Sequence, residues 1–204
     1  RSTALGTASS ASGLDSTAIG WRPAASGDNS IASGGWDDFN GDGYVTANEV
    51  TGATGTLSSA FGIAAQATAT GATAIGGRSA ATGTSSTALG SFSVAGGADS
   101  SAIGKYSAAS GTSSTALGAR SAASGNNSTA IGAFATAGGL HATAVGYASV
   151  ASGDYGIASG GWIDLNGDGH VTANEVTIAS GRESIAFGAG ARAASYQSTA
   201  LGAE

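Results

Sequence analysis

Two short segments of the chain concentrate oxygen-bearing side chains at a regular spacing. They run from Asp38 to Glu49 and from Asp164 to Glu175, and in both the side-chain oxygens fall at positions 1, 3, 5, 9 and 12. Position 6 is glycine and position 8 is apolar in both segments. Calcium takes six to eight oxygen ligands, and a glycine in the middle of such a loop permits its sharp turn. The pattern therefore predicts two structural calcium sites with no open position for catalysis.

This spacing is that of an EF-hand calcium loop. The predicted ligands of the first site are Asp38, Asn40, Asp42, the Tyr44 carbonyl, Thr46 (directly or through water) and Glu49. The predicted ligands of the second site are Asp164, Asn166, Asp168, the His170 carbonyl, Thr172 and Glu175. A true EF-hand has a helix before the loop, whereas Gly-Gly-Trp precedes each loop here, and only the exits resemble helix capping boxes. The alternative is a pair of Asx-turn loops with solvated carboxylates and no metal.

The elements that hold these loops are set by a 14-residue repeat. Glycine recurs on one lattice at Gly6, Gly20, Gly34, Gly62, Gly76, Gly90, Gly104, Gly118, Gly132, Gly146, Gly160, Gly188 and Gly202. An alanine stands two residues before each of these glycines, and a second alanine column follows the first by seven residues, as in Ala102 and Ala109. Such short, glycine-bounded segments indicate short strands joined by tight turns. Stacked repeats of this kind form a β-solenoid, in which each coil pairs its backbone with the next.

The composition agrees with a thin structure. The chain has 204 residues with 36 Gly, one Pro and neither Cys nor Met, and its hydrophobic fraction of 41% is mostly alanine. A thick core of large side chains cannot be assembled from these residues. The net charge of -6 makes nucleic acid an unexpected partner, and no apolar run is long enough for a membrane span, so we expect no membrane contact by this fragment.

The residue after each first-column alanine is apolar in most repeats. This stripe comprises Leu5, Ile19, Phe61, Ile75, Leu89, Ile103, Leu117, Ile131, Val145, Phe187 and Leu201. If the alanines face inward, the stripe faces outward and marks an interface between copies of the chain, because a long apolar surface does not stay exposed to water. The reverse polarity, with the large residues inside as the core of the roll, leaves a small-residue face that also packs closely against a copy.

The repeat predicts a single β-roll region over residues 1–204, interrupted by irregular insertions at about 35–55 and 161–181. Each insertion replaces one 14-residue interval by 28, so the phase of the repeat is kept. Trp36 and Trp162 open the insertions and are expected to cover the interrupted coil, the alternative being a binding surface. His141 and His170 have no partnered nucleophile in the sequence, and we expect no enzyme activity.

Segments such as Asn127-Ser128-Thr129-Ala130-Ile131-Gly132 and Thr87-Ala88-Leu89-Gly90 resemble the head repeat of trimeric autotransporter adhesins, the YadA-like head. The resemblance covers nearly the whole chain apart from the two insertions. It implies an all-β, left-handed parallel β-roll that assembles as a homotrimer. It also implies display on the bacterial outer membrane, through a C-terminal anchor outside this sequence, and a role in virulence through attachment to host cells or extracellular-matrix proteins.

The alternative function is that of a non-adhesive structural solenoid, such as an ice-binding protein. An ice-binding face needs a flat ladder of Thr-x-Thr on successive coils, whereas only single threonines recur here. We therefore expect adhesion rather than thermal hysteresis.

Overall fold

The computed structural model describes residues 1–165, 167–172 and 174–202. Over this part of the chain its regular elements are all β-strands. The chain divides into two compact units, Arg1–Tyr106 and Ser107–Glu204. Each unit is a parallel β-solenoid whose coils repeat every 14 residues outside the insertions, which confirms the fold class expected from the repeat.

In the first unit, the odd-numbered strands form one sheet and the even-numbered strands another. The odd strands are β1 (Thr3–Leu5), β3 (Thr17–Gly20), β5 (Ile31–Gly34), β7 (Ser59–Phe61), β9 (Thr73–Ile75), β11 (Thr87–Leu89) and β13 (Ser101–Ile103). The even strands are β2 (Ser10–Ala11), β4 (Ala24–Ala25), β6 (Gly52–Ala53), β8 (Gln66–Ala67), β10 (Ala80–Ala81) and β12 (Val94–Ala95). We call the two layers the odd sheet and the even sheet.

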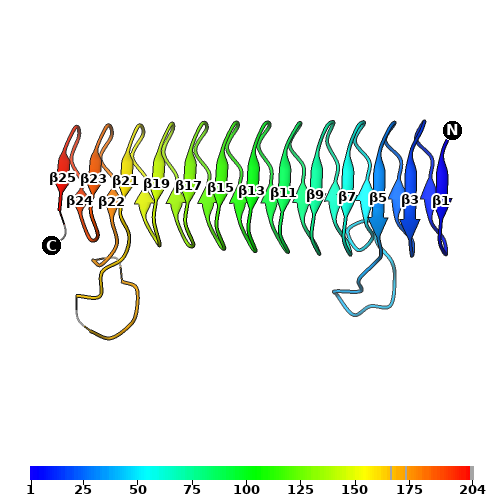
Figure 1. The fold of residues 1–204 in the computed structure, drawn as a ribbon, viewed down its shortest axis with the longest axis horizontal. Helices are drawn as coiled ribbons and strands as arrows, with labels where there is room; N and C mark the ends of the chain where they lie inside the picture. The colour runs from blue at the N-terminus through cyan, green and yellow to red at the C-terminus, as the bar shows by residue number, and fades with distance from the viewer. Residues whose placement is uncertain (166, 173, 203–204) are drawn as a thin grey trace. The chain divides into compact units, whose positions relative to one another are not determined.

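The second unit has the same two layers. Its odd strands are β15 (Thr115–Leu117), β17 (Thr129–Ile131), β19 (Thr143–Val145), β21 (Ile157–Ser159), β23 (Ile185–Phe187) and β25 (Thr199–Leu201). Its even strands are β14 (Ala108–Ala109), β16 (Ala122–Ala123), β18 (Thr136–Ala137), β20 (Val150–Ala151), β22 (Ile178–Ala179) and β24 (Arg192–Ala193). Figure 1 shows the strands of each unit side by side, with turns at both ends of every strand.

Parallel pairing keeps every repeat column in register. In the first unit Ala88 lies opposite Ala74 and Leu89 opposite Ile75. The insertions do not disturb this register, because Ala32 pairs with Ala60 across the first of them. An insertion that replaces a whole repeat interval leaves the columns on both sides in phase, so each loop is held by an uninterrupted ladder.

The alanine columns form the interior of each coil. Ala88 and Ala95 are 0% exposed, whereas Leu89, the neighbour of Ala88 on the same strand, is 42% exposed. Successive side chains of a strand point to opposite faces, so an inward alanine sends the next residue outward. The structure thus decides between the two polarities that the sequence left open: the core is alanine, and the larger residues lie outside.

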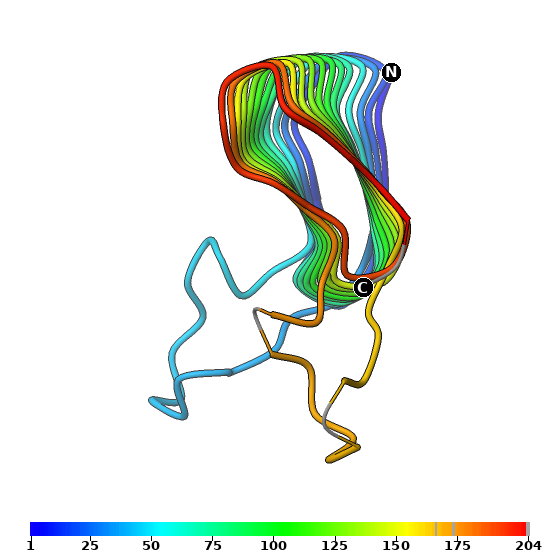
Figure 2. The same ribbon diagram turned by 90° about the vertical axis from the view of Figure 1, so that its left-hand side faces the viewer.

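Each coil has two turn regions. We call the turns that follow odd strands the first edge and those that follow even strands the second edge. Both use a residue in the left-handed conformation, such as Arg22 (φ 61) on the first edge and Asp99 (φ 55) on the second. The insertions leave from the first edge, after Gly34 and after Gly160. Figure 2, which looks along the coils, shows each insertion standing clear of its own coil.

Candidate calcium loops and interaction faces

Each insertion is closed at its base by a short antiparallel clasp. Trp36 pairs with Val50 in the first insertion and Trp162 with Val176 in the second. The Asp37 amide also donates to the Glu49 carbonyl over 2.8 Å. Beneath the first clasp, the buried Thr51 hydroxyl accepts from the Gly35 amide over 2.9 Å and donates to the Gly62 carbonyl over 2.6 Å, and so ties the insertion to the coil. The base of the first insertion is therefore fixed to the coil.

The first halves of the loops are folded around their acidic side chains. In the first loop, Asp38 accepts hydrogen bonds from the amides of Asp42 (3.1 Å) and Gly43 (3.0 Å). The Asn40 side-chain oxygen also accepts from the Asp42 amide, and Asp42 accepts from the Tyr44 amide over 2.7 Å. These contacts form a tight turn that gathers three of the predicted ligands.

The second loop repeats much of this arrangement. Asp164 accepts from the Gly167 amide (2.7 Å) and the Gly169 amide (3.0 Å), and Asp168 accepts from the His170 amide (2.7 Å). Asn166, another predicted ligand, lies outside the described residues. The His170 side chain is exposed, so only its carbonyl belongs to the predicted ligand set.

In both loops, the glutamate at the twelfth position contacts a threonine instead of the aspartates of the predicted site. Glu49 is 0% exposed, and its Oε2 accepts from the Thr46 amide (2.8 Å) and the Thr46 hydroxyl (2.9 Å). Glu175 makes the same pair of contacts with Thr172. Only one half of each capping box is therefore formed, because the glutamate amide bonds to the threonine carbonyl rather than to its hydroxyl, and no helix follows in the described residues. Each glutamate lies against its threonine rather than with the loop aspartates.

The loops thus match a calcium site only in part. Among the described residues no group of three or more His, Asp or Glu side chains is arranged to hold a metal ion. Glu49 nevertheless keeps one buried oxygen, Oε1, without a hydrogen-bond partner. A buried carboxylate oxygen without a partner is costly and would gain from a cation. The donor chemistry therefore fits calcium, whereas the ligand set is incomplete in this conformation.

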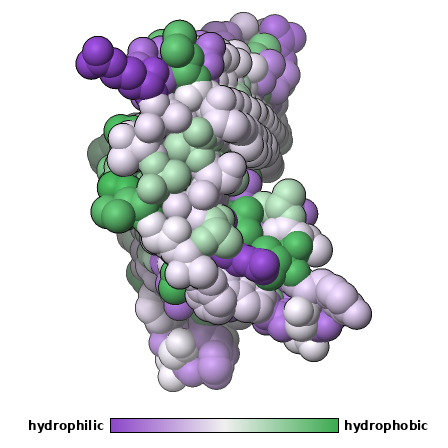
Figure 3. All heavy atoms as spheres, turned by 90° about the vertical axis from the view of Figure 1, so that its right-hand side faces the viewer, coloured by the Kyte–Doolittle hydropathy of each residue, from purple (hydrophilic) through white to green (hydrophobic). Residues whose placement is uncertain are grey.

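The apolar stripe lies on the outer face of the odd sheet. Leu89, Leu117 and Ile131 remain 38–42% exposed, and the outermost strands expose more, with 64% at Leu5 and 75% at Leu201. Ile103 and Val145 of the same stripe are partly buried. Phe61 follows Ser33 in the register, yet its side chain stays 39% exposed. Figure 3 shows apolar surface on one flank of the molecule, opposite the side to which an insertion projects. The odd sheet therefore presents an uncovered apolar face.

The repeat pattern matches a known protein family. The family model described as YadA head domain repeat (2 copies) matches residues 1–22, 53–79, 81–107, 109–135, 137–161 and 179–204. These ranges cover well over half of the chain and leave out most of both insertions. The chain belongs to the YadA head family.

A solved structure is also similar to this YadA-type head. It is the crystal structure of the collagen-binding domain of the Yersinia adhesin YadA, with 33% identity and a TM-score of 0.49 over 74% of this chain and 68% of that chain. No curated protein matches significantly. The family makes the chain an adhesin-type head of the kind found on bacterial surfaces, a structural rather than an enzymatic class. Within the described residues, no helix has the length and hydropathy of a membrane span.

The first insertion of this YadA-type head docks on its own roll through Arg78. The Arg78 guanidinium pairs with Asp37, with Nη2 2.6 Å from Oδ2, and lies 4.7 Å from the centroid of the Phe39 ring and 5.4 Å from that of Phe92. Gln66 of the even sheet donates to the Val50 carbonyl from the other side. The insertion therefore leans over the even sheet and leaves the odd sheet open.

This docking could not be predicted from the sequence, because Asp37 lies 41 residues before Arg78 and no motif links them. The second insertion has Ile163 and Leu165 at the positions of Asp37 and Phe39, so it lacks the two side chains that contact Arg78 in the first.

Trp36 makes an edge contact with Trp21, with ring centroids 5.3 Å apart, and is half-buried. Trp36 therefore packs against the first-edge turn that holds Trp21, and Trp162 lies beside Tyr147, with ring centroids 6.3 Å apart. His141 stacks on Tyr155 at the second edge, at 5.0 Å.

Arg78→Ala should release the first insertion. It removes one partly exposed ion pair and two cation–π contacts, together about 1–2 kcal/mol. We expect chymotrypsin to cleave at Phe39 and Tyr44 roughly tenfold faster than in the unmodified chain. Lys105→Ala, which removes a first-edge cation that contacts Tyr106 instead, is the matched control. Equal cleavage rates in the two variants would show that Arg78 does not hold the insertion.

Acid should loosen the second insertion. The hydrogen bond from the Thr172 hydroxyl lowers the pKa of Glu175, and the amides of Thr172 and Leu165 lower it further, against the opposing effect of burial. Because the folded pKa lies below the unfolded value, the stabilisation is present above the unfolded pKa, about 4.3, and is lost as the pH falls through the folded pKa. Trp162 fluorescence in a chain with Trp21 and Trp36 changed to Phe should report this transition.

Thr172→Val removes the first cause of the shift and should move the transition to a higher pH. An unchanged midpoint in that variant would contradict the assignment of the lowered pKa to the Thr172 hydroxyl.

Proposed function

We propose that this chain is the adhesive part of a homotrimer that binds a host cell-surface or extracellular-matrix protein. The observation that carries the proposal is the uncovered apolar face of the odd sheet, with Leu89 42% exposed in the middle of the first unit. Copies that turn these faces toward a common axis would remove them from water at about 25 cal/mol per Å² of apolar surface. The even sheets and the insertions would then remain available to a partner.

The assembly is tested by the mass of the chain in solution. Leu89 and Val94 are a matched pair, because they lie in one coil with 42% and 43% exposure but on the odd and even sheets respectively. Leu89→Asp would bring three carboxylates together near the axis, so we expect light scattering to show monomers at micromolar concentration. Val94→Asp should remain a trimer. A monomeric unmodified chain, or equal behaviour of the two variants, would contradict the proposal.

Adhesion is tested with the trimer on surfaces coated with matrix proteins. Collagen is the first probe, with laminin and fibronectin beside it and albumin as the blank. Saturable binding to one matrix protein supports the adhesive role, and Leu89→Asp should reduce it by abolishing multivalent attachment. Binding no stronger than to albumin across matrix proteins and host cells would contradict it.

The proposal includes structural calcium in the insertions. Asp38, Asn40 and Asp42 in the first loop, with Asp164 and Asp168 in the second, would supply side-chain oxygens, and the ion would stiffen the loops. Support comes from the folded first half of the first loop, from the amide contacts of Asp164 and Asp168 in the second, and from the buried, unpartnered Oε1 of Glu49.

Titration calorimetry with calcium up to millimolar concentration should show saturable binding, since extracellular calcium modules bind at about 10⁻⁴–10⁻³ M. Asp42→Ala should remove one site and Asp168→Ala the other, while Asp99→Ala, at the second edge, should remove neither. The melting temperature should also rise with calcium, because a ligand that binds only the folded state stabilises it. No heat and no change in melting would leave the loops as metal-free Asx turns.

A further inference from the structure

Outside the insertion, the two edges of the first unit carry opposite charge. In the first unit, the first edge holds Arg22, Arg78 and Lys105, and the second edge holds Asp15, Asp28 and Asp99. Outside the insertion, Arg1 is the one charged residue of this unit that departs from the rule, and its amino group pairs with Asp15. Arg22, Lys105 and the three aspartates are all exposed.

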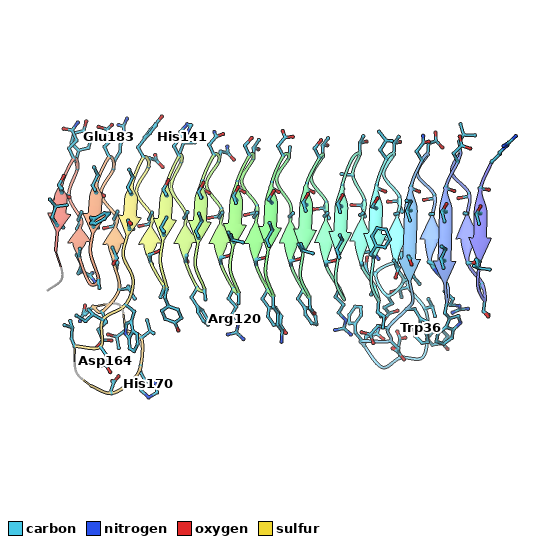
Figure 4. All side chains as sticks on the ribbon, viewed as in Figure 1. Trp36, Arg120, His141, Asp164, His170 and Glu183 are labelled. Atoms are coloured by element: carbon cyan, nitrogen blue, oxygen red, sulfur yellow. The ribbon has the colours of Figure 1, made fainter. Side chains whose placement is uncertain are left out.

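The second unit shows the same separation in a weaker form. Arg120 lies at the first edge, and Asp154 and Glu183 lie at the second edge, where Arg182 stands 3.5 Å from Glu183. Figure 4 shows Arg120 at the edge from which the insertion with Asp164 and His170 hangs, and His141 and Glu183 at the opposite edge.

The left-handed positions of the two edges do not require this separation. That of the first edge is held by Ala8 as well as Arg22, and that of the second edge by Ser85 as well as Asp99, so neither position needs a charge. Asp28 does have a role in the coil, because its carboxylate accepts the Leu14 amide of the preceding coil over 2.8 Å. Exposed charges that the coil does not need, such as Arg22 and Asp99, indicate electrostatic complementarity to a partner.

We propose that the first edge of one copy lies beside the second edge of the next, so that each junction of the trimer pairs cations with carboxylates. The inference rests on the trimer proposed above. When three copies turn their odd sheets to one axis, rotational symmetry brings unlike edges together at every junction, because each copy follows the next head to tail. The first insertion does not stand in the way, since Arg78 and Gln66 hold it over the even sheet.

Charge reversal within the first unit tests the pairing. The first variant is Arg22→Glu with Lys105→Glu, the second is Asp15→Arg with Asp99→Arg, and the third combines all four changes. The left-handed position tolerates arginine, as Arg22 and Arg78 show, so the backbone at Asp15 and Asp99 should be preserved. The matched control is Ser10→Glu with Val94→Glu, two exposed positions within the even strands β2 and β12, away from both edges.

Sedimentation equilibrium at low salt should show the trimer weakened about tenfold or more in each double variant, because like charges then meet at all three junctions. The combined variant should recover the affinity of the unmodified chain, and the control should not change. The loss should shrink at 1 M salt, where the screening length is about 3 Å. If circular dichroism shows that a double variant does not fold, the test is the salt dependence of the unmodified trimer. Its association should weaken as salt rises from 0.05 to 1 M, because salt screens the paired charges.

The outcomes separate the two proposals. A trimer whose reversed variants behave like the control, or whose combined variant does not recover, overturns the edge pairing and leaves the apolar assembly standing. An unmodified chain that is monomeric overturns both proposals.

Discussion

Gly132→Ala should lower the melting temperature of the chain by roughly 10 °C, whereas Gly138→Ala should leave it nearly unchanged. Gly132 has φ +125, and a Cβ built there would lie 2.5 Å from the carbonyl oxygen of Gly146 in the next coil. Side chains rarely adopt such a φ, at a cost of about 1–3 kcal/mol, and the clash is with backbone that is itself fixed in the ladder. We expect a total loss of about 3 kcal/mol or more, and a loss of 1 kcal/mol lowers the melting temperature by about 2–4 °C at this size.

Gly138 is the matched control, because it lies in the neighbouring turn and its nearest contact would be the Ser124 hydroxyl at 3.8 Å. Its replacement by alanine should change stability by less than about 0.5 kcal/mol. Thermal unfolding followed by circular dichroism measures both variants. Equal melting temperatures of the two variants would contradict the close approach of neighbouring coils at the glycine column.

Ala123→Leu should destabilise the roll by about 3 kcal/mol or more, at the upper end for an overpacked core. Ala123 is 0% exposed, as are Ala116 and Ala130, the first-column alanines before and after it in the chain. The space between the sheets is filled by methyl groups, and the sheets cannot separate locally without stretching the ladders on both sides. Chemical denaturation should show an earlier midpoint, with loss of folded protein at 37 °C if the cost is higher.

Ala122→Leu is the control for this change, since Ala122 precedes Ala123 in β16 but points outward and is partly exposed. The same three carbon atoms added there should cost less than about 0.5 kcal/mol. A similar loss in both variants would show that the effect comes from the strand and not from the interior.

Much of the architecture could be predicted from the sequence because one repeat unit recurs many times. A glycine every 14 residues with alanine two positions before it defines the coil length, the in-register columns and the places where the insertions leave the roll. The loop contacts of Asp38 and Asp42 follow from the same kind of local information, because each aspartate bonds to amides within five residues of itself. Hydrogen bonds between residues close in the chain, and contacts at a fixed repeat spacing, can be predicted from the order of the residues.

Only the tertiary structure decided which way the columns face. Ala88 and Leu89 are both apolar, and the alternation alone allows either to be inside until the narrow coil places Ala88 at 0% and Leu89 at 42% exposure. It also decided the partner of Glu49, which the loop spacing assigns to calcium and the capping-box spacing assigns to Thr46. The calcium-loop motif and the capping-box motif both use Glu49, and in this structure the Glu49 carboxylate bonds to Thr46.

The docking of the first insertion and the separation of charge between the edges also depend on the fold. Asp37 and Arg78 meet because the coil returns the chain to the first edge at every repeat, and Asp99 and Lys105 stand apart because half a coil lies between them. The sequence determined the repeat, since each coil is built from contacts at one fixed spacing. Contacts between residues at unrelated spacings depend on the path of the whole coil, and only the folded chain decided them.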